Sequence, residues 1–523
     1  MGNLALTSSA SSQSLSFDFE LSSRNLAEVA SYLGPINPGS GEWAKILVTD
    51  VTSDSQSVNP GSLFVALPGI THHGATFARD AIKSGAVAIV TDKAGDAIVT
   101  DRSIPIITVS RPEVDLGHLA HWFYDNPMSK LYAAGITGTN GKTTTTTLLY
   151  EMWQEAGVTA GLIGTIATRM PGVEIPAIRT TPTADSIARS SAQMVELHVR
   201  SLAMEVSSHG LELHRINGAR FAAVGFTNLS QDHLDFHGTM ERYFQAKSRL
   251  FSHEFAEKAF INIDDSYGAR LASSAEIFVE TLSLSDKGAT WHLLDHRKTR
   301  LGYQLQVRGP EGILIESEVA LRGRHNLENY LMALAFAFDS GIDPLVLARV
   351  SATLRGAPGR LERVDLGQEF EAFVDYAHSP EAVEKVLATL RESTEGKLIA
   401  VLGCGGDRDK SKRPLMARAS VHGADISIFT SDNPRSEDPM AIIDEMTAGV
   451  KLGADKIVEI DRAGAIARAV AMAEKGDCVV VLGKGHEQGQ AFKDRVEPFD
   501  DRIELAKAIE SLAKGRDFRS GKS

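Results

Sequence analysis

Short apolar runs separated by polar, glycine-rich turns recur along the chain, with longer amphipathic stretches between them. Apolar runs of this length are typical of buried strands, and the amphipathic stretches are typical of helices. The alternation predicts an α/β fold with mainly parallel sheets, because parallel neighbours need a helical crossover. The expected strands lie at residues 62–67, 86–90, 104–109, 160–166, 200–206, 221–226, 259–265, 373–376, 398–402, 426–430, 456–460 and 478–482.

Three longer segments have the apolar spacing of helices, namely residues 77–84, 241–251 and 323–338. Residues 290–318 interrupt the α/β pattern with a β-rich excursion. The elements that surround the excursion should therefore belong to one larger domain.

Three domains are expected, because 523 residues are about three times a typical domain length. The pattern breaks at Asp125-Asn-Pro127 and near Arg355-Gly-Ala-Pro-Gly-Arg360. We expect a mobile tail over residues 1–20, a small α/β domain over 21–127, a central P-loop ATPase-type domain over 128–357 and a Rossmann-like α/β domain over 358–523.

Composition narrows the function. The chain has 67 acidic and 54 basic residues and a net charge of −13, which argues against a nucleic-acid partner. Cys404 and Cys478 are the only cysteines, too few for a disulfide framework, so we expect a cytoplasmic protein. We expect no membrane span and no signal peptide, because no apolar run is long enough.

The segment Gly138-Thr-Asn-Gly-Lys-Thr143 lies between an expected strand and an expected helix. Its glycines allow backbone N–H groups to surround an anion, Lys142 adds a positive charge, and the Thr143 hydroxyl suits a phosphate-bound Mg²⁺. Ile136 stands where the usual phosphate loop has its first glycine, and an ordinary helix-capping loop is the alternative. We predict a polyphosphate site.

Acidic and polar groups follow two other expected strands of the central domain. Glu205 ends residues 200–206, where a second acidic group reaches Mg²⁺ in P-loop domains. The run after residues 221–226 is rich in possible ligands, and its lack of thiolates favours Mg²⁺ over zinc. Its polar members are Asn228, Asp232, His233, Asp235 and His237.

Lys247 shares the apolar stripe of its predicted helix with Tyr243, Phe244, Leu250 and Phe251. A lysine at such a position usually extends its ammonium group to water. A lysine with a lowered pKa would instead react with CO₂ and become a metal-binding carbamate. The pattern leaves both interpretations open.

Four polar loops follow strands of the last domain and would form a second ligand face: residues 375–380, 403–409, 431–435 and 483–487. Two ligand faces and a phosphate loop, with no recognisable nucleophile–base arrangement, favour phosphoryl transfer by a kinase or a ligase.

These motifs together resemble the Mur ligases of peptidoglycan synthesis over nearly the whole chain. The resemblance rests on Gly138-Thr-Asn-Gly-Lys-Thr143, Glu205-Val-Ser-Ser-His209, Asp232-His-Leu-Asp235, Asp375-Tyr-Ala-His378 and Gly483-Lys-Gly-His-Glu487. Asp432-Asn-Pro-Arg435, Asp54-Ser55 and residues 60–66 resemble the member that adds the third residue to UDP-N-acetylmuramoyl-L-alanyl-D-glutamate.

The resemblance implies ATP as co-substrate, Mg²⁺, and the following site residues. ATP would contact Gly138, Thr139, Asn140, Gly141, Lys142, Thr143, Thr144, Asn326, Asn329, Arg360 and Asp375, although the two asparagines also suit simple capping. Metal ligands would be Thr143, Glu205, His233 and a carbamylated Lys247, and the catalytic set Lys142, Glu205, His233 and Lys247. The UDP substrate would contact Ser55, Thr180, Thr181, Ser207 and Arg215, with Ser55 at the uracil and the 21–127 domain as its binding domain.

The added amino acid would contact Arg408, Asp432, Asn433, Pro434, Arg435, Gly483 and Glu487. Among these, Arg435 predicts meso-diaminopimelate, because a guanidinium binds its distal carboxylate and repels the bare ammonium of lysine. The alternatives are L-lysine addition, a folylpolyglutamate-synthetase-type ligase and a non-enzymatic nucleotide switch. We expect a monomer.

Overall fold

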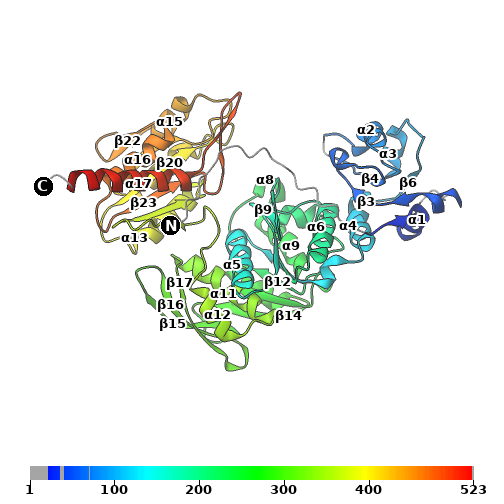
Figure 1. The fold of residues 1–523 in the computed structure, drawn as a ribbon, viewed down its shortest axis with the longest axis horizontal. Helices are drawn as coiled ribbons and strands as arrows, with labels where there is room; N and C mark the ends of the chain where they lie inside the picture. The colour runs from blue at the N-terminus through cyan, green and yellow to red at the C-terminus, as the bar shows by residue number, and fades with distance from the viewer. Residues whose placement is uncertain (1–21, 36–40, 70, 521–523) are drawn as a thin grey trace. The chain divides into compact units, whose positions relative to one another are not determined.

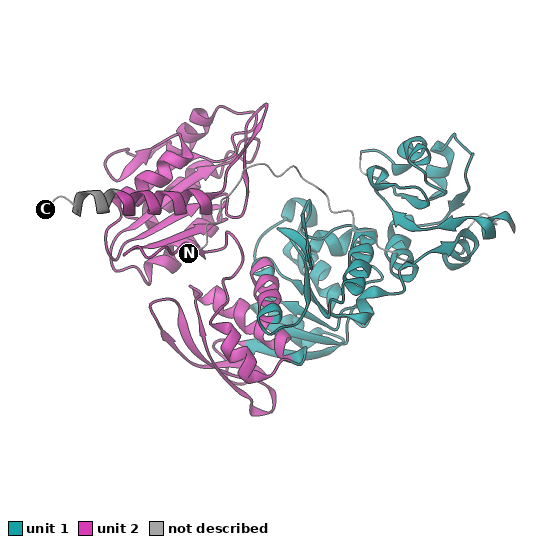
Figure 2. Ribbon diagram, in the orientation of Figure 1, with its two compact units in different colours: residues 1–142, 153–282, 339–341 teal, residues 143–152, 283–338, 342–523 magenta. Residues whose placement is uncertain are grey.

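The computed structural model describes residues 22–35, 41–69 and 71–520 of the chain. The mobile tail predicted for residues 1–20 lies outside them. The chain forms two compact units, residues 1–142, 153–282 and 339–341 in the first and residues 143–152, 283–338 and 342–523 in the second (Figure 2). Among the described residues, none of the helices combines the length and apolar character needed to cross a bilayer.

The first unit begins with a four-stranded parallel sheet in the order β3 (Asp50–Thr52), β4 (Ser62–Ala66), β5 (Ala88–Thr91) and β6 (Ile106–Thr108). Every residue of β4, β5 and β6 is buried, as expected for strands covered on both faces. The accompanying elements are β1 (Arg24–Asn25), α1 (Leu26–Leu33), β2 (Leu47–Val48), α2 (Ala78–Lys83), α3 (Lys93–Ile98) and α4 (Pro112–Phe123) (Figure 1).

A second sheet of the first unit carries the phosphate loop. The strands that this unit contributes to it are, in order, β10 (Val173–Pro176), β9 (Ala167–Met170), β8 (Ala160–Ile163), β11 (Ser201–Glu205), β7 (Tyr132–Thr137), β12 (Ala223–Phe226), β13 (Lys258–Asn262) and β14 (Phe278–Ser283). Six of these strands run parallel, namely β8, β11, β7, β12, β13 and β14, so their carboxyl ends lie at one edge of the sheet. The helices between them are α5 (Lys142–Glu155), α6 (Ala184–Glu196), α7 (Ser208–Glu212), α8 (Leu234–His237), α9 (Met240–Ser248) and α10 (Ser266–Ser274).

The second unit contains an antiparallel meander and a six-stranded sheet. The meander, β15 (Trp291–Lys298), β16 (Tyr303–Arg308) and β17 (Leu314–Val319), confirms the predicted β-rich excursion. Helices α11 (Arg324–Asp339) and α12 (Pro344–Ser351) follow it. The six-stranded order is β18 (Glu362–Arg363), β19 (Glu371–Asp375), β23 (Cys478–Leu482), β20 (Leu398–Cys404), β21 (Ile426–Ser431) and β22 (Lys456–Val458).

Alternate residues of these last strands build two separate cores. Leu402 and Val480 point into one and Val401 and Val479 into the other, because successive side chains of a strand face opposite sides. Both faces therefore need covering helices, which gives the doubly wound arrangement predicted from the sequence. The remaining elements are α13 (Pro380–Arg391), α14 (Arg413–Gly423), α15 (Pro439–Thr447), α16 (Arg462–Met472), β24 (Gly489–Ala491), β25 (Val496–Pro498) and α17 (Asp501–Ser520).

Candidate active site

The predicted phosphate loop connects β7 to α5, as expected. Gly138 has φ 153° and Gly141 φ 89°, backbone conformations that side chains disfavour. A Cβ on Gly138 would lie 1.8 Å from the Thr227 hydroxyl oxygen, so only glycine fits. Asn228 supports the loop, because its backbone oxygen accepts a hydrogen bond from Thr139 N–H (2.8 Å) and its side-chain oxygen one from Asn140 N–H (3.1 Å).

Two lysines converge on one carbonyl of this loop. The Lys142 ammonium donates to the carbonyl oxygens of Gly138 (2.9 Å) and Thr139 (3.0 Å). The Lys247 ammonium, from α9, donates to the same Gly138 oxygen at 2.8 Å. Two lysine side chains therefore meet at one loop, where the ammonium group of Lys142 is suited to attract an anion.

Lys247 is 1% exposed, so its ammonium group does not reach water, and this excludes the first of the two sequence-based interpretations. Burial, with Lys142 nearby, holds the pKa of Lys247 well below its usual value. Its Nζ lies 4.7 Å from the centre of the Tyr243 ring. A buried lysine with a lowered pKa is more often the neutral amine, which is the form that reacts with CO₂.

Glu205 ends β11 beside the end of β7, where its partner in register is Ile136. It is 1% exposed. Thr165 contacts both carboxylate oxygens, through its N–H to Oε1 (2.8 Å) and its hydroxyl to Oε2 (3.0 Å). The Thr165 hydroxyl oxygen also lies 3.0 Å from that of Thr180. Thr165 therefore joins Glu205 to a predicted substrate residue, a role that sequence reasoning missed.

The four predicted substrate contacts of the central domain lie together. The Thr181 hydroxyl lies 3.0 Å from the Ser207 hydroxyl and accepts from Ser207 N–H at 2.9 Å. Arg215 donates to the Thr181 carbonyl at 3.2 Å, and Thr180 precedes Thr181. Ser55 lies on a separate turn, residues Ser55–Ser57, after β3.

The polar run after β12 divides into supporting and exposed groups. The buried His237 contacts the Ser208 hydroxyl (3.0 Å) and stacks on Tyr243. Asp232, His233 and Asp235 are exposed. His233 has φ 53° and its ring lies 6.3 Å from that of Tyr243, the ring that Lys247 also contacts.

No group of three or more His, Cys, Asp or Glu side chains within the described ranges has the arrangement of a metal site. The predicted metal set uses only two such side chains, Glu205 and His233, together with a hydroxyl and a modified lysine. That set stays a prediction.

The amides predicted to meet adenine are buried and hydrogen-bonded on α11. Asn326 donates to the Arg322 carbonyl at 2.9 Å, and Asn329 donates to the Asn326 side chain at 3.4 Å. The Thr145 hydroxyl donates to the Asn329 side-chain oxygen at 3.3 Å. These contacts are consistent with capping and packing roles, and the predicted contact of the two amides with adenine stays a prediction.

Asp375 and Arg360, also predicted to meet the nucleotide, flank one turn of the second unit. The Asp375 carboxylate accepts from Leu361 N–H (2.7 Å) and Ala377 N–H (2.8 Å). Burial raises the pKa of Asp375, and Arg360 opposes that shift. The Arg360 guanidinium lies 4.6 Å from the centre of the Tyr376 ring.

The predicted amino-acid site contains a buried cation that the sequence did not single out. Lys484, fully buried, donates to Asn433 Oδ1 (2.9 Å) and lies 3.4 Å from Asp432 and from Glu487. Asn433 in turn donates to Glu487 at 2.7 Å. Lys484 therefore fixes both the amide orientation of Asn433 and the position of Glu487. The flanking glycines of Gly483-Lys-Gly485 were the available signal.

Arg435 follows this cluster and has φ 51°. Its Nη1 donates to the Gly406 carbonyl at 2.6 Å. Within the described part of the chain no carboxylate lies within ion-pair distance of its guanidinium. An arginine with donors left unpaired by acids is suited to bind a ligand carboxylate.

Comparison with known proteins identifies the family of this chain. The sequence matches the Mur ligase family catalytic domain over residues 47–125, the Mur ligase middle domain over 136–337 and the Mur ligase glutamate ligase domain over 359–485. The chain belongs to the Mur ligase family. Membership confirms the predicted family, the ligase class and the three-domain α/β fold, while the domain boundaries stay predictions.

Two curated relatives and one solved structure have the same name, UDP-N-acetylmuramoyl-L-alanyl-D-glutamate–2,6-diaminopimelate ligase. The Streptomyces coelicolor protein is 45% identical, over 94% of this chain and 97% of its own. The Bacillus licheniformis protein is 39% identical, over 93% and 98%. The solved structure is 31% identical, with a TM-score of 0.69, over 94% of this chain and 99% of its own.

Proposed function

We propose that the protein is the ATP-dependent ligase that adds meso-diaminopimelate to UDP-N-acetylmuramoyl-L-alanyl-D-glutamate in peptidoglycan precursor synthesis, with release of ADP and phosphate. The names of the relatives support this reaction. The structural observation that supports this choice of amine is the position of Arg435: its guanidinium donates to the Gly406 carbonyl, and among the described residues no carboxylate lies within ion-pair distance of it.

The glycines of the 138–141 loop and Lys142 would hold the phosphates of ATP. The loop geometry supports this role, because Gly138 and Gly141 have the positive φ values that glycine-rich phosphate loops require. Lys142 would leave the Gly138 and Thr139 carbonyls for the β- and γ-phosphates, where it neutralises charge that develops in the transition state.

Thr143, near the start of α5, and Glu205, at the end of β11, would hold Mg²⁺ through hard oxygen donors, the kind that this ion prefers. Bound there, Mg²⁺ would offset the negative charge of the phosphates. Glu205 is oriented for this by its two contacts with Thr165.

Lys247 as an ammonium does not fit beside a second cation, whereas Lys247 as a carbamate would. Its burial and lowered pKa favour the neutral amine that CO₂ carbamylates. The resulting anion would replace the charge conflict between Lys247 and Lys142 by an attraction. We propose that the carbamate and His233 form the second Mg²⁺ site.

The reaction has two chemical steps. The D-glutamyl carboxylate attacks the γ-phosphorus of ATP, which forms an acyl phosphate and releases ADP. The amine of meso-diaminopimelate then attacks the acyl carbon to give a tetrahedral intermediate, and phosphate leaves as the amide forms. Thr180, Thr181, Ser207 and Arg215 would hold the dipeptide for the first step.

The amine substrate would be recognised through the carboxylate and the ammonium group at its distal end. Arg435, helped by the exposed Arg408, would bind the distal carboxylate in a bidentate manner. Glu487, placed by Asn433 and Lys484, would accept a hydrogen bond from the distal ammonium. A cytoplasmic location and a monomeric state stay predictions.

A phosphate-release assay tests the proposal. Release should require ATP, the UDP dipeptide and an amine together, and meso-diaminopimelate should be strongly preferred over L-lysine. Preference for L-lysine would identify the related lysine-adding reaction, activity with a folate in place of the UDP dipeptide would identify a folylpolyglutamate-type ligase, and amine-independent ATP hydrolysis would indicate a switch protein. ¹⁸O placed in the substrate carboxylate should appear in the released phosphate.

A further inference from the structure

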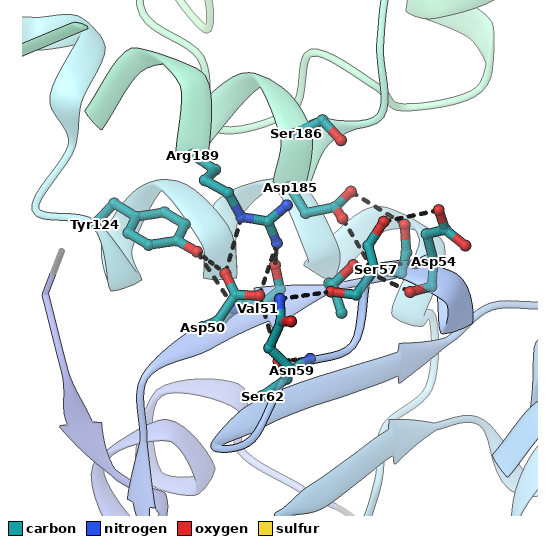
Figure 3. Close-up of polar contacts among 12 residues, drawn as sticks. Asp50, Val51, Asp54, Ser57, Asn59, Ser62, Tyr124, Asp185, Ser186 and Arg189 are labelled. Carbon is teal, nitrogen blue, oxygen red and sulfur yellow. Dashed lines mark hydrogen bonds and ion pairs between the residues drawn. The ribbon is translucent and has the colours of Figure 1, made fainter. Parts of the chain in front are cut away.

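Helix α6 presents two charged side chains, Asp185 and Arg189, one helical turn apart, to strand β3 and the residue that follows it (Figure 3). None of the predicted site residues lies on this helix. Three alanines of α6, Ala184, Ala188 and Ala192, pack into the apolar core of the first 127 residues. The helix therefore follows Thr180 and Thr181, two of the predicted substrate residues, in sequence and packs in the core of the domain predicted to bind uracil.

Arg189 binds the start of β3. Its Nε and Nη2 donate to the two Asp50 oxygens at 2.9 and 3.0 Å, and Nη2 also donates to the Val51 carbonyl at 2.7 Å. The Tyr124 hydroxyl donates to Asp50 as well. The side chains of Arg189 and Asp50 are each less than a quarter exposed, so their ion pair is less accessible to water than an ion pair on the surface.

Asp185 binds the residue that follows β3. It is 1% exposed, and its two oxygens accept from the N–H (2.9 Å) and the hydroxyl (3.1 Å) of Ser53. A buried carboxylate is costly unless both oxygens are satisfied, and Ser53 satisfies both. Ser53 is two residues before Ser55, the predicted uracil contact.

The turn that carries Ser55 keeps its own shape independently of Asp185. The Asp54 carboxylate accepts from Gln56 N–H at 3.0 Å and from the Ser57 hydroxyl at 2.9 Å. Asp185 therefore determines where this turn lies relative to α6 and not how it is folded.

The other end of the same arrangement is the Thr180–Thr181 pair, which immediately precedes α6. Thr181 is fixed to the end of β11 through the Glu205 carbonyl (3.0 Å) and Ser207. Only three residues separate Thr181 from Asp185. One short segment thus connects the predicted dipeptide contacts to the predicted uracil turn.

We propose that Asp185 and Arg189 are positioning residues that set the spacing between the Ser55 turn and the Thr180–Thr181 pair. They make the site selective for a ligand that reaches both, a uridine nucleotide joined to an acidic peptide. This inference rests on the proposed function. The simpler alternative is that the two side chains only stabilise the packing of α6.

The spacing role predicts a specific loss on Asp185→Ala. The KM for the UDP dipeptide should rise about tenfold or more, because charge-assisted hydrogen bonds to buried groups are lost. The kcat and the KM values for ATP and meso-diaminopimelate should stay within about twofold. Ser186→Ala is the matched control, because Ser186 lies on the same helix and its hydroxyl shares a hydrogen bond with that of Thr183, away from β3 and Ser53.

Binding of the separate parts distinguishes spacing from stability. UDP alone and N-acetylmuramoyl-L-alanyl-D-glutamate alone should inhibit Asp185→Ala and the wild type equally. The extra affinity that the whole UDP dipeptide gains over its two separate parts should be smaller in the variant. Equal weakening of UDP and of the whole substrate would overturn the inference, and so would an unchanged KM or a general loss of every affinity together with thermal stability.

Asp185→Asn and Ser53→Ala extend the test if Asp185→Ala folds poorly. Asn keeps one acceptor and should raise the KM less than Ala. Ser53→Ala should add little to Asp185→Ala, because both remove the same hydroxyl–carboxylate contact; full additivity would contradict the inference. Absence of wild-type turnover with the UDP dipeptide would instead refute the proposed function.

Discussion

Replacing Arg435 by asparagine removes the guanidinium while respecting the backbone. Arg435 has φ 51°, a left-handed conformation that Asn tolerates better than Ala. The substitution therefore avoids the backbone strain that Arg435→Ala would add. Its effect on catalysis should report the lost contact with the distal carboxylate of meso-diaminopimelate.

The expected magnitude follows from the half-buried position of Arg435. Loss of one partner of a buried, hydrogen-bonded charge pair costs about 2–5 kcal/mol, and partial exposure favours the lower part of that range. We expect a loss of about 2–4 kcal/mol, which is roughly a 30- to 1,000-fold fall in kcat/KM for meso-diaminopimelate.

The assay is phosphate release with meso-diaminopimelate and with L-lysine, which lacks the distal carboxylate. The kcat/KM for L-lysine should stay the same or rise in Arg435→Asn, because a repulsive cation has been removed. Arg418→Ala is the control, since Arg418 is exposed and its guanidinium donates to the Pro414 carbonyl on its own helix.

An equal fall in kcat/KM for both amines would refute this reasoning. That result would mean that the bond from Arg435 to the Gly406 carbonyl shapes the loop, and that the guanidinium does not read the substrate. Arg435→Lys should lie between the wild type and Arg435→Asn, because it keeps the charge but loses the bidentate geometry.

Three further predictions concern buried charges. Lys247→Ala should lose at least about 100-fold in kcat and regain part of it with acetate, because acetate supplies the missing anion; no rescue would argue against a carbamate. Arg413→Met should raise the KM for meso-diaminopimelate but not the KM for ATP. Arg413 donates to both Glu437 oxygens (2.8 and 3.0 Å), and Glu437 accepts from the N–H of Asp407, which lies beside Arg435. Parallel changes in both KM values would contradict this prediction. Burial lowers the pKa of His121 to about 3, so the unfolded state takes up the proton first and stability falls as pH drops from 6.5 toward 3. The loss should reach about 2 kcal/mol by pH 5. Calorimetry should show a weaker acid-side loss of melting temperature in His121→Phe than in the wild type or in the exposed control His72→Gln.

The phosphate loop and the strands could be predicted because their signals are local. Gly138, Gly141 and Lys142 are close in sequence, and each apolar run reports its own burial. The buried position of Lys247 could be suggested from its helical stripe. Its donation to Gly138, 109 residues away in sequence, could not be predicted, since that contact depends on how α9 packs against the loop.

Other members of the site have no local signal. Thr165 reaches Glu205 across 40 residues, and Asp185 reaches Ser53 across 132, so nothing near either residue indicates the partner. The amides of Asn326 and Asn329 were correctly located at the head of a helix, but their buried partners, the Arg322 carbonyl before α11 and Thr145 on α5, became visible only in the structure.

Lys142 and Lys247 both donate to the Gly138 carbonyl. This shared contact connects nucleotide binding at the loop to carbamylation of Lys247. One carbonyl oxygen partly compensates two ammonium groups, and burial adds a desolvation cost to the charge of Lys247. Two changes relieve this conflict: a polyphosphate that attracts Lys142 away, and conversion of Lys247 from a cation to an anion. Each change makes the other more favourable, because a carbamate needs the cation that accompanies ATP. ATP–Mg²⁺ and CO₂ should therefore bind cooperatively, and nucleotide affinity should fall when CO₂ is removed from the wild type but not from Lys247→Ala.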